Sequence, residues 1–177
     1  LRRRLQLRAL MLLDVGALGA STVSACCLLG SPRPARVWVS AGLMVLAMLG
    51  CVLAPAAPGL GLLSILLSLA SAGFALQRRG GRVAPMGLHR ALGGVTMAAL
   101  VAMSLGMTRG GGTMTEHAHG VPLGAIAQAF VAGYLVYSGW LLVGMARAHR
   151  RRPASRDLLR LGEVAGMALG VLLMCVM

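Results

Sequence analysis

The feature that most constrains this chain is a series of apolar runs that are almost free of charge. A helix needs roughly 20 apolar residues to cross about 30 Å of hydrocarbon, and the runs reach that length. Charged residues make up 12% of the chain, about half the ~25% of soluble domains. Single strands would leave backbone groups unpaired in lipid, and the runs lack the alternation of an outer-membrane barrel. The sequence therefore predicts an all-α integral membrane bundle.

We expect about six transmembrane helices, which form a single domain over residues 1–177. The predicted spans cover residues 9–30, 37–53, 60–76, 88–107, 123–146 and 158–177. Pro55, Pro58 and Gly59 break the helix and permit a tight turn between the second and third spans. The first span is too long, and too weakly followed by a cleavage site, for a removed signal peptide.

The net charge of +13 would suggest nucleic acid in a soluble protein. Here the arginines flank the apolar runs, so they indicate membrane topology and contacts with anionic lipid, not nucleic-acid binding. With the N-terminus outside, twelve arginines fall on the cytoplasmic side: Arg33, Arg36, Arg78, Arg79, Arg82, Arg90, Arg147, Arg150, Arg151, Arg152, Arg156 and Arg160. The other side has Arg2, Arg3, Arg4, Arg8 and Arg109. This asymmetry predicts a multi-pass protein of the inner (plasma) membrane, with loop 108–120 facing the extracytoplasmic side.

Methionine is frequent, with twelve residues, and its soft thioether suits Cu(I), as does imidazole. In the fourth span, His89, Met103 and Met107 lie within about 40° of one another, and Met97 lies roughly 80° to the side. The alternative is that methionine serves as a flexible apolar filler of the core.

Two further spans carry stripes of the same kind. Met44, Met48 and Cys51 share a face of the second span, and Glu163, Met167 and Met174 share a face of the sixth. If the three stripes faced a common axis, they would form a ladder of sulfur sites across the membrane.

The loop after the fourth span adds further donors. Met114, Glu116, His117 and His119 lie close together, after three glycines that let the chain fold around a ligand. His-x-His places both rings on one side of an extended segment. Metal sites need three or four donors, and Met107 could supply another. The alternative is a solvated polar loop.

Ionisable residues inside spans usually have a partner or a role. Glu163 is expected to pair with Arg160 or with an arginine of another helix, and His89 is either a ligand or an interfacial residue. The chain has four acidic residues and no nucleophile–base set, so we do not expect an enzyme. Haem fits poorly, because paired histidines on facing helices are lacking.

The order of these features resembles an actinobacterial family of multi-pass membrane proteins of unknown function. The resemblance rests on Leu88-His89-Arg90, the methionine-studded helix that follows, and the His/Met-rich outer loop. It covers most of the chain and implies a multi-span architecture with copper handling. In that family a histidine precedes the methionines of the second helix, whereas this chain has Ser40 and Ala41 there.

The leading hypothesis is a membrane protein that binds or passes copper. The loop would capture the ion through Met114, His117 and His119, and the path inward would follow Met107, Met103, Met97 and His89. The alternative is a non-catalytic accessory subunit of a larger membrane complex, such as a respiratory assembly or a copper-dependent oxygenase. A third possibility is a small-molecule permease whose pocket is lined by Gln128, Tyr134, Tyr137 and Ser138.

Overall fold

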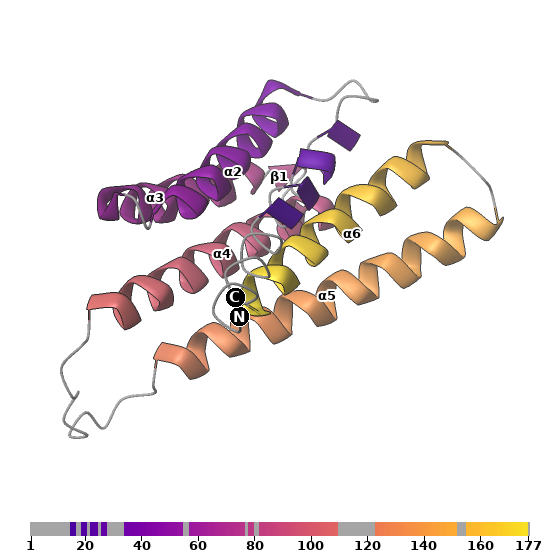
Figure 1. Cartoon of the computed structure of the whole chain (residues 1–177). Coiled ribbons are helices and arrows are strands. Elements are labelled where there is room, and N and C mark those ends of the chain that lie inside the picture. The colour runs from indigo at the N-terminus through magenta and orange to yellow at the C-terminus, as the bar shows by residue number, and fades with distance from the viewer. Residues whose placement is uncertain are drawn as a thin grey trace.

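The computed structural model describes residues 15–16, 19–20, 22–24, 26–27, 34–54, 57–76, 78–79, 82–109, 123–151 and 155–176. Five helices are bounded within these ranges: α2 (Ala35–Leu53), α3 (Pro58–Ala75), α4 (Pro85–Arg109), α5 (Leu123–Arg151) and α6 (Ser155–Val176) (Figure 1). The described residues between 15 and 27 are helical as well. The described part of the chain is therefore helical, apart from short connections and one hairpin.

Four helices are long and apolar enough to cross a membrane. Their spans are Ala35–Leu53, Pro85–Gly106, Gly124–Arg150 and Asp157–Cys175. The apolar part of α3, Gly59–Ala75, is shorter. The predicted first span lies only partly within the described residues, so the count of six crossings stays a prediction.

Several predicted helix ends differ from those in the structure. The fourth helix begins at Pro85, because proline is well suited to the first turn, where its missing N–H costs nothing. The fifth continues to Arg151, past the predicted end at residue 146. The connection before α4 was predicted to be a loop, but it contains an antiparallel hairpin of β1 (Arg78–Arg79) and β2 (Arg82–Val83).

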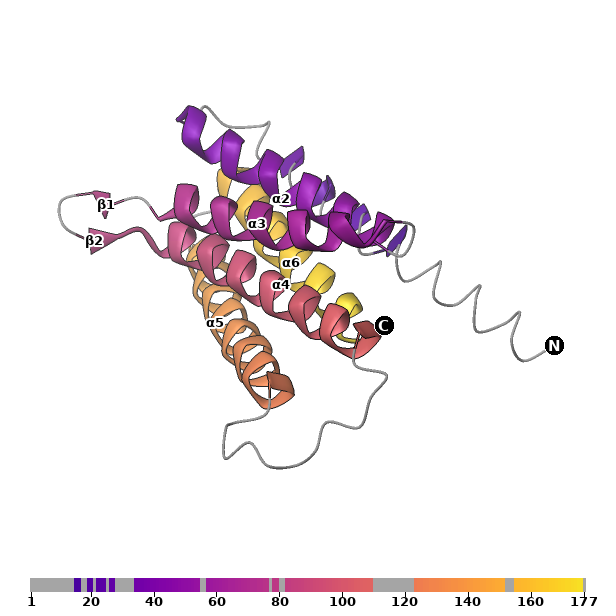
Figure 2. The ribbon, with the colours of Figure 1, turned by 90° about the vertical axis from the view of Figure 1, so that its left-hand side faces the viewer.

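Successive helices run in alternating directions. Figure 2 shows the start of α2, the hairpin, the end of α5 and the start of α6 toward the same end of the bundle. Most of the predicted cytoplasmic arginines belong to these segments. Arg90, counted among the same arginines, differs from them because it is only 8% exposed within α4.

The central helix of the bundle is α4. Half of the residues in its span are buried inside the protein, against 11% for α5. It contacts α3, α5 and α6, while α2 packs against α3. A Cβ added at Gly94 would lie 2.7 Å from the Ser68 carbonyl oxygen, so α3 and α4 approach at backbone distance. Small residues permit such packing in membranes, where burial of apolar surface between helices gives little drive.

Two serines join α2 to α3 through reciprocal hydrogen bonds. The Ser40 hydroxyl donates to the Ser71 carbonyl at 3.0 Å, and the Ser71 hydroxyl donates to the Ser40 carbonyl at 2.7 Å. Both side chains are buried. Interhelical hydrogen bonds of this kind help to fix helix pairs within the bilayer. They set the face of α2 on which Met44 follows, one turn after Ser40.

Candidate functional site

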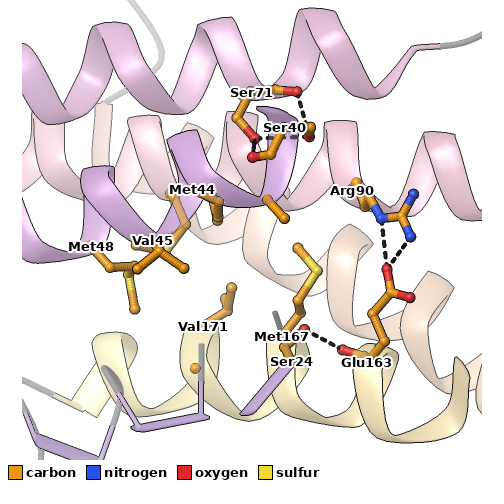
Figure 3. Close-up of a pocket in the computed structure, with 13 residues that line it drawn as sticks. Ser24, Ser40, Met44, Val45, Met48, Ser71, Arg90, Glu163, Met167 and Val171 are labelled. Carbon is orange, nitrogen blue, oxygen red and sulfur yellow. Dashed lines mark hydrogen bonds and ion pairs between the residues drawn. The ribbon is translucent and has the colours of Figure 1, made fainter. Parts of the chain in front are cut away.

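A cavity of about 40 Å³ lies between α2, α4 and α6 (Figure 3). At 10–15 Å³ per solvent position, this is room for about three waters or a small ion. Its walls combine thioethers, hydroxyls and one ion pair. The lining residues are Ser24, Ser40, Ala41, Met44, Val45, Met48, Ser71, Arg90, Met97, Glu163, Met167, Gly170 and Val171.

Four methionines from three helices line this cavity. Met44 and Met48 are four residues apart and so share one face of α2. Met97 joins them from α4 and Met167 from α6. Met48 and Met97 are each only 2% exposed. The structure thus brings methionines of all three stripes to one place.

The end of the cavity that lies away from Met48 is polar. In Figure 3 the pair of Arg90 and Glu163 lies at one end and Met48 at the other, with Met167 between them. The Arg90 Nε–H donates to the Glu163 Oε1 atom at 2.6 Å, and Nη2 contacts the same oxygen. The expectation that an arginine of another helix pairs with Glu163 is confirmed. A charge pair within spans is costly unless each charge is matched, so this contact joins α4 firmly to α6.

At this polar end, Ser24 and Ala20 from the N-terminal part of the chain contact α6. The Ser24 hydroxyl donates to the Glu163 backbone carbonyl at 3.0 Å, and both residues are buried. A Cβ at Gly166 would lie 3.0 Å from the Ala20 carbonyl oxygen. The helical residues between 15 and 27 therefore pack closely along α6 beside the cavity.

The donor set determines what the cavity could hold. Thioether sulfur is a soft, uncharged ligand that favours Cu(I) over hard divalent cations. Within the described ranges, no three His, Cys, Asp or Glu side chains are grouped so as to hold a metal ion. A metal in this cavity would therefore be held mainly by sulfur, with the Glu163 carboxylate as the nearby negative charge.

No protein-family model, curated protein or solved structure matches this chain. The site is therefore interpreted from its own chemistry.

His89 lies on a different face of α4. It is fully buried inside the protein. Its Nε2 atom lies 3.0 Å from the Ser138 hydroxyl, which itself donates to the Tyr134 carbonyl at 2.7 Å. Since that hydroxyl proton is used, we assign Nε2–H as the donor to Ser138. His89 thus faces α5, while the next residue, Arg90, faces the cavity.

The other predicted copper ligands fall into three groups, according to whether the structure describes the side chain, only the backbone, or neither. Met103 packs against the buried cluster that contains Met48 and Met97, so sulfur continues from the cavity along α4. Met107 belongs to α4, but its side chain lies outside the described structure. The predicted loop ligands, Met114, His117 and His119, also fall outside the described residues.

The predicted permease residues do not form one pocket. Tyr134 and Ser138 are buried beside His89, whereas Gln128 is exposed on the outside of α5. Tyr137 is half-buried, and its hydroxyl donates to the Pro85 carbonyl at 3.2 Å. These side chains join α5 to α4 and present no shared cavity in the part of the chain described.

Sequence reasoning placed Glu163 on one face with Met167, but it missed the other polar residues of the cavity. Arg90 was counted only as a topology signal at the cytoplasmic end of the fourth span. Ser40 was noted only where a histidine was expected. A signal was present, since Ser40, Met44 and Met48 recur at four-residue spacing on one helix face.

Proposed function

We propose that this protein binds Cu(I) in the cavity between α2, α4 and α6 and passes it through the membrane. The observation that carries the proposal is the convergence of Met44, Met48, Met97 and Met167 on one small cavity. The resemblance to a family whose residue pattern implies copper handling supports the same function.

The chemistry of the cavity favours a soft monovalent cation. Removing an ion from water is costly in a low-dielectric interior, and the cost rises steeply with its charge. Thioethers offset this cost only for ions that accept soft donors. The single carboxylate of Glu163 offers one negative charge, which Arg90 balances in the empty site.

The proposed path begins in the loop that carries Met114, His117 and His119, on the extracytoplasmic side of the plasma membrane. Met107 and Met103 lead from that end of α4 to Met97 at the cavity. His89, on the α5 side of α4, would receive the ion beyond the cavity. The arginine-bearing end of the bundle (Figure 2) supports this orientation, because positive residues favour the cytoplasmic side.

The cavity is tested by replacing two buried sulfurs in the variant Met48→Leu/Met97→Leu. We expect at least a ten-fold weaker Cu(I) affinity, equivalent to about 1.4 kcal/mol. Leucine conserves volume, so the fold should persist with a cost below about 1.5 kcal/mol per site. Affinity is measured in detergent by competition with a chromogenic Cu(I) chelator. Met145→Leu, on the half-buried part of α5, is the matched control, and an equal affinity in both variants would contradict the proposal.

The loop is tested separately with the variant His117→Ala/His119→Ala. At limiting copper we expect less metal per purified protein than in the wild type, because capture is impaired while the cavity is intact. Metal analysis of both preparations measures the difference. Equal copper content would remove the loop from the path but leave the cavity assignment standing.

The second candidate function is that of an accessory subunit in a larger membrane complex. The outer face of α5 favours it, since Val136 is 74% exposed and Trp140 is 67% exposed. Trp140 stacks on Tyr137 at 5.9 Å between ring centroids, which gives a firm aromatic surface. A partner that co-purifies at fixed stoichiometry in mild detergent, together with absent copper, would favour this function over the first.

A further inference from the structure

We propose that Arg90 is a built-in competitor for the metal ion: it holds Glu163 in the empty site and releases the carboxylate when Cu(I) binds. The inference rests on the proposed function and adds a charge-controlled switch to it. It begins from the fact that both charged side chains line the same cavity as the four methionines.

The carboxylate and the thioethers line the same small cavity, and Met167 lies between the ion pair and Met48 (Figure 3). Glu163 and Met167 are four residues apart and share one face of α6, while Arg90 and Met97 are seven apart on one face of α4. Arg90 uses both Nε and Nη2 on the single oxygen Oε1 of Glu163. A cation held by the thioethers would therefore share one small cavity with the carboxylate that Arg90 contacts, and Met167 is the thioether between them.

Charge balance makes the two cations compete. The thioethers are neutral, and the pair of Arg90 and Glu163 sums to zero. A Cu(I) ion added to this buried site leaves one positive charge uncompensated as long as Arg90 remains in place. The site is balanced again if Cu(I) takes over the carboxylate and the guanidinium moves away.

The Arg90 side chain lies near an end of the bundle, to which it can move when it leaves the cavity. It lies five residues after Pro85, where α4 begins, at the end of the bundle that carries the hairpin (Figure 2). A long arginine side chain can extend from such a depth to the interface, where lipid phosphates solvate it. Metal binding would then be coupled to a movement of Arg90 toward that surface.

The test compares three variants of the full chain with Cu(I) and Ag(I), again by chelator competition in detergent. Arg90→Gln removes the competing guanidinium and is expected to bind at least ten-fold more tightly than the wild type. Glu163→Gln leaves a lone guanidinium and is expected to bind at least ten-fold more weakly. Arg90→Gln/Glu163→Gln, with neither charge, should fall between the two single variants.

Failure of the switch and failure of the copper site give different results. If Arg90→Gln binds as weakly as the wild type or more weakly, while Met48→Leu/Met97→Leu loses binding, the competitor role is overturned and the site stands. If the methionine variant binds like the wild type, the site itself is wrong. Should Arg90→Gln fail to fold, Arg90→Lys serves instead. Its ammonium lacks the planar fork of arginine, so we expect tighter Cu(I) binding, and unchanged affinity would overturn the switch.

Discussion

Glu163→Gln is expected to destabilise the fold by about 3–5 kcal/mol, the usual cost of removing one partner of a buried charge pair. In the paired state the Arg90 side chain is 9% exposed and that of Glu163 is 1% exposed, so Arg90 must leave its packed position to be solvated in the variant. Arg90→Gln should also destabilise the fold, because it removes the guanidinium that contacts the buried Glu163 carboxylate. Arg90→Gln/Glu163→Gln should recover most of the loss, since no unpaired charge is left.

Thermal unfolding of the four proteins in one detergent measures this double-mutant cycle. Arg160→Gln is the matched control: Arg160 precedes Glu163 by three residues on α6, is exposed, and should change the stability by less than about 0.5 kcal/mol. If the double variant were as unstable as Glu163→Gln alone, the pair would not join α4 to α6 in the way described.

The second large effect is expected from Gly94→Ala. The new Cβ would lie 2.7 Å from the Ser68 carbonyl oxygen and 3.1 Å from the Ala72 Cβ. The obstructing atom is backbone of α3, so the two helices must separate. Overpacking of this kind costs about 1–3 kcal/mol, and it would lower the melting temperature in detergent.

Gly106→Ala is the control for this prediction, because it lies on the same helix and no atom of the described residues lies within 4 Å of the added Cβ. It removes backbone freedom without a clash and should stabilise α4 by about 0.5–1 kcal/mol. Opposite signs for the two substitutions are the expected result. Equal stabilities would mean that α3 and α4 do not meet at Gly94.

The helices could be predicted from the sequence because long apolar runs are typical of helices that can cross a bilayer. The runs that became α2, α4, α5 and α6 are each long enough to span the membrane and free of charge in the middle. The shorter α3 was also predicted, over residues 60–76, and it forms over Pro58–Ala75. Its hydrogen bonds to α2 through Ser40 and Ser71 are displayed by no local pattern. The hairpin before α4 was missed because two-residue strands leave no periodic signal.

The candidate site could be predicted only in part. Spacing identified the faces of Met44, Met48 and Met167, since positions four apart share a helix face. It could not decide which face of α4 meets the other helices, because neighbouring positions differ by about 100°. That rotation sends Arg90 to the cavity and His89 to Ser138. The hypothesis that placed His89 on the same face as Met103 therefore could not predict the hydrogen bond between His89 and Ser138.

The ion pair between α4 and α6 also bears on how the chain is assembled. Arg90 precedes Glu163 by 73 residues, and synthesis proceeds from the N-terminus. The guanidinium of α4 is therefore made before the carboxylate that it contacts. A chain that stops short of α6 would consequently carry the charge of Arg90 without the opposite charge of Glu163.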